Sequence, residues 1–232
     1  MTKRMLRVAG VALLCAATSP AMAATIIVQN GSFEAQPLAD GQFTAGVVTG
    51  WAVTGGGAGA YNPEPGVVDA AADGMNVLYL NTGIAGAIYD GTARQVVAAA
   101  VEANSLYTLG FALARRNDPN VSGGVLVADL LAGDAVLASR SFTDSDLALG
   151  RFQAFTLSYT SGAAQASPLA IQFRSIFGGR SFTQTLVDGV RLDVTPQVAA
   201  PVPEPATWAL MVLGFGAVGG VLRRHNVPAV AA

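Results

Sequence analysis

The predicted fold class is all-β: an antiparallel jelly-roll β-sandwich over residues 24–195. Large apolar side chains in this region alternate with small or polar ones, which is the pattern of a strand with one buried face. Gly, Pro, Asn and Asp break the pattern every few residues, and no long segment has the helical period. Roughly ten short strands separated by turns are typical of two packed antiparallel sheets.

Each strand is expected where the alternation runs between two breaks. It is clearest at 106–113, where one face carries Tyr107, Leu109, Phe111 and Leu113. Gly55–Gly59 has neither the lysine nor the strand-to-helix setting of a phosphate loop, so we expect a flexible loop there. In chain order the expected strands are Thr25–Gln29, Trp51–Thr54, Asn76–Leu80, Ala93–Val97, Leu106–Leu113, Gly124–Leu131, Ala135–Phe142, Phe152–Tyr159, Leu169–Phe173 and Thr185–Val194.

The first 23 residues have the three parts of a secretory signal peptide. A basic start with Lys3 and two arginines precedes an apolar stretch at 8–17, and Ala21-Met22-Ala23 supplies small residues where a signal peptidase cleaves. The apolar stretch is too short to span a bilayer. Cleavage after Ala23 removes Cys15, the only cysteine, which excludes disulfides and thiolate chemistry in the mature body.

The C-terminal region has a second hydrophobic segment. A Pro-rich linker at 196–205 is followed by an uncharged apolar run at 206–222, two arginines and a short tail at 226–232. At about 1.5 Å per residue the run spans roughly 25 Å, close to the thickness of a bilayer core. We therefore expect one transmembrane helix at 206–225, with the body outside and the basic cluster in the cytoplasm.

This C-terminal region resembles the PEP-CTERM sorting signal of Gram-negative bacteria, in its PEPxxWA variant. The resemblance implies that an exosortase, a membrane transpeptidase-like enzyme, sorts the protein to the cell envelope, the cell surface or an extracellular matrix with exopolysaccharide. A plain anchor that stays in the membrane is the alternative. The resemblance rests on Pro203, Glu204, Pro205, Trp208, Ala209, Arg223 and Arg224.

The body resembles the galactose-binding-like sandwiches, which include many carbohydrate-binding modules. The resemblance rests on Val28–Glu34, followed by Gly50-Trp51, on Asp73–Val77 before a strand, and on Leu186–Leu192. It implies a structural Ca²⁺ held by Glu34, Asp188 and backbone carbonyls.

The position of Asp188 in its strand bears on the same site. Asp188 shares parity with Leu186, Val190 and Leu192, and a carboxylate on an apolar face needs a partner or a cation. The alternative is that Asp188 caps its Asp-Gly turn and Glu34 pairs with an arginine.

Composition restricts the chemistry of the body, which is acidic and has no Lys, His or Cys. This composition excludes a Ser-His-Asp triad, a thiolate nucleophile and a zinc cluster. It also excludes a surface that binds along the phosphates of a nucleic acid. Carboxylate pairs alone can hydrolyse glycosides, but the body's aspartates stand in turns, where Asp is common for local reasons. We expect no enzymatic activity.

Sugar binding needs exposed aromatic rings beside polar side chains. We expect such a site from Tyr61 and Asn62 in a loop, and from Arg115, Arg116 and Asn117 at a strand end. The favoured function is thus a secreted, non-catalytic module that binds exopolysaccharide. The alternatives are a structural matrix protein without a specific ligand and a glycoside hydrolase that uses carboxylates alone.

Overall fold

The structure is a computed structural model that describes residues 22–82, 90–117, 124–177, 184–197 and 205–225. The chain divides into two compact units, Met1–Gln197 and Val198–Ala232. The predicted signal peptide up to residue 21, and Pro203 and Glu204 of the sorting signal, lie outside the described residues.

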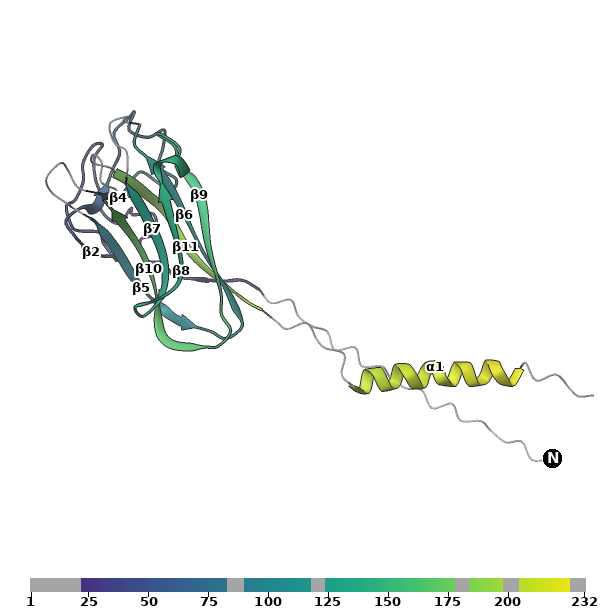
Figure 1. Ribbon diagram of the computed structural model, residues 1–232. Helices are drawn as coiled ribbons and strands as arrows, with labels where there is room; N and C mark the ends of the chain where they lie inside the picture. The colour runs from purple at the N-terminus through teal and green to yellow at the C-terminus, as the bar shows by residue number, and fades with distance from the viewer. Residues whose placement is uncertain (1–21, 83–89, 118–123, 178–183, 198–204, 226–232) are drawn as a thin grey trace, which may run out of the picture. The chain divides into compact units, whose positions relative to one another are not determined.

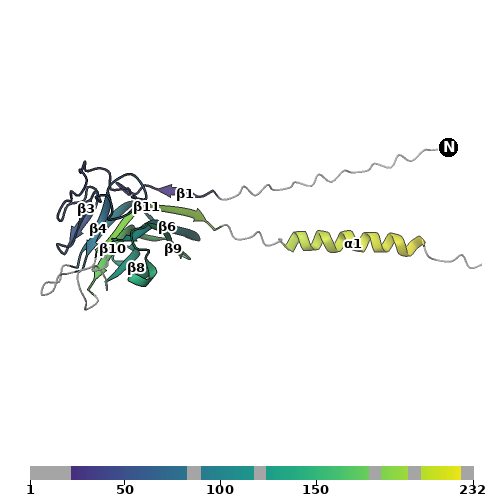
Figure 2. The same cartoon turned by 90° about the horizontal axis from the view of Figure 1, so that it is seen from above.

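The first unit is a sandwich of two antiparallel sheets, as the alternation predicts (Figure 1). One sheet, which we call the front sheet, has the order β3-β4-β11-β6-β9, and β1 pairs with β11 beside it (Figure 2). The back sheet has the order β2-β5-β10-β7-β8. The front strands are β1 (Ala24–Ile26), β3 (Ala58–Tyr61), β4 (Val77–Asn81), β6 (Ser105–Arg115), β9 (Gln153–Thr160) and β11 (Gln184–Pro196). The back strands are β2 (Ala52–Thr54), β5 (Thr92–Val101), β7 (Val125–Ala132), β8 (Ala135–Thr143) and β10 (Gln165–Ile176).

The core lies between the two sheets and follows the predicted period of two. The alternate residues Tyr107, Leu109, Phe111 and Leu113 of β6 are all buried and face the core. Phe111 makes an edge contact with Phe173 of β10, with ring centroids 5.3 Å apart, so aromatic packing joins the two sheets.

Strand β3 corrects the last two residues of the predicted loop at Gly55–Gly59, whose first three residues form a bend as expected. All four residues of Ala58–Tyr61 are buried, and β3 pairs with β4. The sequence hides this strand because its side chains are small. They must be small, since a Cβ at Gly59 would collide with the carbonyl oxygen of Thr44 and lie 2.8 Å from the ring of Tyr79.

Strand β11 corrects the predicted parity of Asp188. The register of β11 against β6 shifts between Asp188 and Arg191, and Gly189 has a positive φ of 58°. This bulge reverses the alternation. Val190 therefore faces the core, while Asp188 and Arg191 face the outer side of the front sheet.

A long connection at 62–76 covers the middle of that outer side. Val67 and Val68 pack with Ala114 of β6 and Leu186 of β11 in a second apolar cluster. The outer side is thus divided into two open parts, one at the end of β6 that carries Arg116 and one near Ala112.

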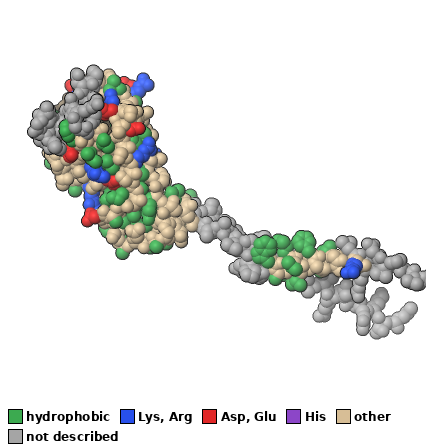
Figure 3. Space-filling view, in the orientation of Figure 1, with side chains coloured by type: hydrophobic (Ala, Val, Ile, Leu, Met, Phe, Trp, Pro, Cys, Tyr) green, Lys and Arg blue, Asp and Glu red, His purple; other side chains and the backbone are tan. Residues whose placement is uncertain are grey.

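The second unit contains helix α1 (Pro205–His225), which confirms a helix at the predicted position. Its apolar side chains are exposed (Figure 3), with Val212 70% and Phe215 74% accessible. Among the described residues, no helix is both long and apolar enough to cross a membrane. The predicted transmembrane span at 206–225 is therefore not found in the described part of the chain.

Candidate binding pocket on the front sheet

The first open part of the outer side, which we call the aromatic pocket, has a volume of ≈ 230 Å³. It lies where β4 and β6 end and β11 begins. Its walls are formed by Phe43, Tyr61, Tyr79, Asn81, Arg116 and Gln184.

The strand pattern places the pocket residues on one side of the sheet. Tyr79 and Asn81 are alternate residues of β4, so both face outward. Gln184, the first residue of β11, pairs with Asn81 in the ladder. Tyr61 ends β3 and forms a bridge with Phe43, which brings a residue from a preceding loop to the mouth of the pocket.

Aromatic rings form the apolar wall. The rings of Phe43 and Tyr79 meet edge to face, with centroids 6.0 Å apart. The Tyr79 hydroxyl donates to the carbonyl oxygen of Thr44 at 2.9 Å, and burial raises the pKa of Tyr79, so the hydroxyl stays neutral. The Tyr61 hydroxyl has no hydrogen-bond partner within the described part of the chain, which leaves it available to a ligand.

Amide and guanidinium groups form the polar wall. Arg116 Nη1 donates to Gln184 Oε1 at 3.0 Å, and Gln184 Nε2 donates to Asn81 Oδ1 at 2.9 Å. The guanidinium carbon of Arg116 lies 5.9 Å from the centroid of the Tyr61 ring. This chain of bonds fixes the three side chains, and it leaves the Nδ2 donors of Asn81 without a partner among the described residues.

The structure brings together only two of the five predicted ligand residues, Tyr61 and Arg116. Asn62 is buried and donates to the carbonyl oxygen of Leu38 at 2.9 Å. Arg115 donates to the carbonyl oxygen of Asp144 at 3.1 Å, and Asn117 lies outside the pocket lining. The expected loop position of Tyr61 is also wrong, because Tyr61 ends β3.

Sequence reasoning missed Phe43, Tyr79, Asn81 and Gln184. Tyr79 and Asn81 carry a usable signal, because a period of two along the predicted strand places both on the face opposite Leu78 and Leu80. Phe43 and Gln184 carry none, since only the folded chain brings their segments to this end of the sheet.

The two predicted metal ligands both bind the turn at 72–76. Asp188 Oδ2 accepts from the backbone N–H groups of Ala72 and Asp73 at 2.7 and 2.8 Å. Glu34 Oε1 accepts from those of Met75 and Asn76 at 2.8 and 2.6 Å. Each carboxylate therefore holds one half of the same turn.

Asp188 also caps its own turn, because Oδ1 accepts from the Gly189 N–H at 2.7 Å. The side chain is fully buried, and burial raises the pKa of Asp188 to about 7, although the three amide hydrogen bonds oppose the rise. No cluster of three or more acidic, His or Cys side chains suited to a metal occurs among the described residues.

Comparison with known proteins gives two family matches. The HpiC1-like family, described as HpiC1 cyclase, matches residues 24–193, and the PEP-CTERM protein-sorting motif matches residues 201–224. No curated protein matches the sequence. The sorting motif agrees with the predicted resemblance and implies secretion and exosortase-dependent sorting to the cell envelope of Gram-negative bacteria.

Solved structures with similar folds include enzymes. A Stig cyclase from Fischerella sp. TAU in complex with (3Z)-3-(1-methyl-2-pyrrolidinylidene)-3H-indole is 20% identical, with a TM-score of 0.63 over 76% of this chain and 100% of that chain. A cyclase from the same source in complex with 4-(1H-indol-3-yl)butan-2-one is 20% identical, with a TM-score of 0.61 over 76% and 100%.

An arabinose-bound α-L-arabinofuranosidase is 15% identical, with a TM-score of 0.51 over 74% of this chain and 26% of that chain. At these identities the likeness to solved structures concerns the fold alone. The family match spans most of the body: the chain belongs to the HpiC1-like family and carries a PEP-CTERM sorting motif.

Proposed function

We propose that this protein binds carbohydrate at the cell envelope, with exopolysaccharide as the polymer, and that it does so without catalysis. The observation that carries the proposal is the aromatic pocket. Apolar faces of sugar rings pack on aromatic side chains, and sugar hydroxyls need polar groups in fixed positions. Phe43, 63% exposed, supplies the first beside the buried rings of Tyr61 and Tyr79, and Asn81 and Arg116 supply the second.

The lining of the pocket supports a non-catalytic role. Glycoside hydrolysis needs two carboxyl groups beside the scissile bond, and the described residues that line the pocket include no carboxylate. Asp188, whose pKa is raised, is fully buried and lies outside this lining, so it has no access to a ligand there.

A small aromatic molecule is the second candidate ligand. The observation in its favour is the same apolar wall, because three of the six lining residues are aromatic. The two cyclases of similar fold were solved with indole-containing ligands. A flat ring between Tyr61 and Phe43 would use the aromatic wall and leave the amide groups of Asn81 and Gln184 unused.

Binding measurements on the full-length chain in mild detergent test the proposal. Calorimetric titration with neutral oligosaccharides and, separately, with indole decides between the two ligand classes. We expect Arg116→Gln to weaken oligosaccharide binding about tenfold, since a hydrogen bond to a charged group contributes about 1.5–3 kcal/mol. Arg115→Gln is the matched control, because the neighbouring Arg115 side chain contacts Asp144 instead. Absence of binding to any saccharide would refute the function.

For the tail, we propose that the segment 206–222 enters the membrane while exosortase acts on Pro203-Glu204-Pro205. The apolar side chains exposed on α1 support this, because a helix that is apolar on all sides needs an apolar environment. Replacing the Pro-Glu-Pro triplet with alanines should leave insertion intact and block processing. A variant of unchanged mass and location would refute a recognition role.

We further propose that Glu34 and Asp188 hold Ca²⁺. Asp188 is a buried carboxylate that makes no ion pair within the described part of the chain, and such charges are normally paired or bound to metal. Carboxylate oxygens are suitable ligands for Ca²⁺. The two residues bind the same turn, so a cation there would fix the cover of the front sheet.

A further inference from the structure

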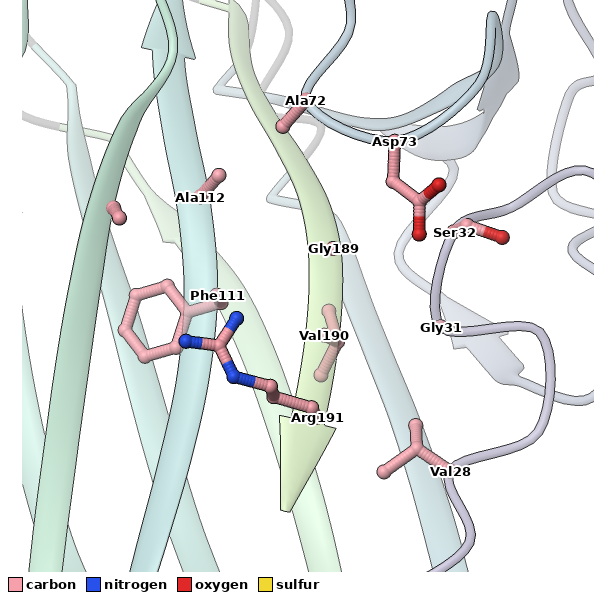
Figure 4. A pocket seen from close by; sticks show the side chains of 11 residues that line it. Val28, Gly31, Ser32, Ala72, Asp73, Phe111, Ala112, Gly189, Val190 and Arg191 are labelled. Atoms are coloured by element: carbon pink, nitrogen blue, oxygen red, sulfur yellow. The ribbon is translucent and has the colours of Figure 1, made fainter. Parts of the chain in front are cut away.

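The second open part of the outer side, which we call the groove, has a volume of ≈ 550 Å³. It lies between the N-terminal segment, the turn at 72–73 and strands β6, β9 and β11 (Figure 4). The side chains that matter for the argument are Ser32, Asp73, Ala112, Ala154 and Arg191.

The floor of the groove is made of small residues. Ala112 of β6 and Ala154 of β9 are paired neighbours that both line it. Gly110, in the interior of β6, pairs with Arg191, and a Cβ there would lie 2.9 Å from the guanidinium carbon of Arg191. A glycine inside a strand weakens it and often marks a close approach. Here it lets the guanidinium group lie against the strand.

Arg191 reaches the groove because of the bulge in β11. The shift of register between Asp188 and Arg191 turns this side chain outward. Within the described part of the chain the Arg191 guanidinium makes no hydrogen bond, ion pair or cation–π contact, and its side chain is exposed. All of its donors are therefore open to a ligand.

The acceptors lie on the other side of β11. Figure 4 shows Arg191 reaching from β11 across β6, while Asp73 points toward the N-terminal segment that carries Ser32. Neither the Asp73 carboxylate nor the Ser32 hydroxyl has a side-chain hydrogen bond or ion pair among the described residues. The groove thus offers unbonded donors on one side and unbonded acceptors on the other.

We propose that the groove is a second saccharide site, selective for a uronate unit, and this rests on the proposed function. Arg191 binds the sugar carboxylate through two parallel N–H···O bonds, a geometry that guanidinium and carboxylate share. Asp73 and Ser32 accept hydrogen bonds from ring hydroxyls. The ligand needs both groups, because a simple anion would leave Asp73 unbonded and would be repelled by it.

The test compares two ligands that differ only at C6, which is a carboxylate in one and a neutral hydroxymethyl group in the other. The full-length chain in mild detergent is titrated with a galacturonic acid tetrasaccharide and with the same tetrasaccharide after reduction of its carboxyl groups. We expect Arg191→Gln to weaken binding of the acidic ligand about 10- to 100-fold, as loss of a charge-assisted bidentate contact implies. Binding of the reduced ligand should change less than about twofold, which also shows that the variant is folded.

Two further variants complete the design. Arg140→Gln, which removes an arginine that lies over the Phe142 ring outside the groove lining, should leave both affinities unchanged. Gly110→Ala should displace the Arg191 guanidinium and reproduce the selective loss.

Equal affinity of the acidic ligand for Arg191→Gln and for the unmodified chain would overturn the inference. If the reduced ligand still bound and Arg116→Gln still weakened that binding about tenfold, the proposed function would stand without the groove. Absence of binding to both tetrasaccharides would overturn the proposed function and the inference together.

Discussion

The aromatic pocket and the groove lie on the same side of the same sheet, yet only the polar side chains of the pocket are hydrogen-bonded to one another. In the pocket, Arg116, Gln184 and Asn81 are bonded to one another beside aromatic rings. In the groove, Arg191 and Asp73 are charged and have no side-chain partner within the described part of the chain. The proposed ligand is accordingly a neutral ring in the pocket and a charged one in the groove.

This difference between the pocket and the groove follows from the order of residues along β6, which contributes to both sites. Along the outer side of β6 the residues are Gly110, Ala112 and Ala114, and Arg116 follows directly after the strand. Ala114 lies under the 62–76 connection, so the small residues remain exposed on one side of the cover and the arginine on the other. The two sites are therefore separated by the cover, and its stability decides whether they remain distinct.

The largest expected effect concerns this cover and comes from pH. Burial raises the pKa of Asp188 from 3.8 to about 7, so the folded state favours the protonated form. The contribution of protonated Asp188 to the stability of the folded state is complete below about pH 4 and is lost as the pH rises through 7. In EDTA the chain should be less stable at pH 8 than at pH 5, by up to a few kcal/mol.

Urea unfolding at both pH values measures this effect, and Asp188→Asn should remove it, because an amide does not titrate. Equal stability of the unmodified chain at pH 5 and pH 8 would contradict a raised pKa of Asp188 in the folded state.

A smaller effect is expected from Gly59→Ala, which breaks the pocket but not the groove. The added Cβ would collide with the Thr44 carbonyl oxygen, so β3 must shift away from its loop. Overpacking of this kind costs about 1–3 kcal/mol. Neutral ligands should bind less tightly while binding in the groove persists. Gly162→Ala is the control, because a Cβ there meets nothing within 4 Å. Equal melting temperatures for the two variants would show that β3 is not constrained.

Ca²⁺ should stabilise the cover by a similar amount. A ligand at 100 times its dissociation constant contributes about 2.7 kcal/mol, which raises the melting temperature by roughly 5–10 °C for a chain of this size. The rise should be greater at pH 8, where Asp188 is ionised, and much smaller with Mg²⁺, which prefers an octahedral shell. Identical melting curves in EDTA and Ca²⁺ would leave Asp188 and Glu34 as turn-binding carboxylates only.

The smallest effect separates the two sites by salt. Raising ionic strength shortens the Debye length and screens exposed charges. Binding of an acidic ligand at Arg191 should weaken roughly threefold between low and high salt, while binding of a neutral ligand at the pocket stays constant. Calorimetry at two salt concentrations measures both, and equal sensitivity would remove the distinction.

Regular alternation made most of the fold predictable, and irregular backbone made the rest unpredictable. The β6 face of Tyr107 and Phe111 is found as expected, because large side chains mark the period. Strand β3 was missed because packing against Thr44 requires small residues that give no periodic signal. The predicted parity of Asp188 with Val190 and Leu192 was wrong because a bulge at Gly189 reverses the alternation. The sequence signal of that bulge is the glycine inside the strand.

Residues of the candidate site were predictable only where their own type and their position next to a strand end indicate a binding role. Tyr61 and Arg116 could be selected as an aromatic and a cation next to strand ends. Phe43 and Gln184 join them through pairing with distant segments, which depends on the order of strands in the sheet rather than on neighbours in the chain.

The central claim, that a neutral sugar binds between the aromatic and amide walls, is tested most directly by nuclear magnetic resonance. The side-chain amide signals of Asn81 and Gln184 would be followed while a neutral oligosaccharide is added to the isotopically labelled full-length chain. The account predicts saturable shifts of both signals, with the Asn62 amide, which is bonded to Leu38, unchanged. Shifts confined to other surfaces, or none at saturating ligand, would contradict it.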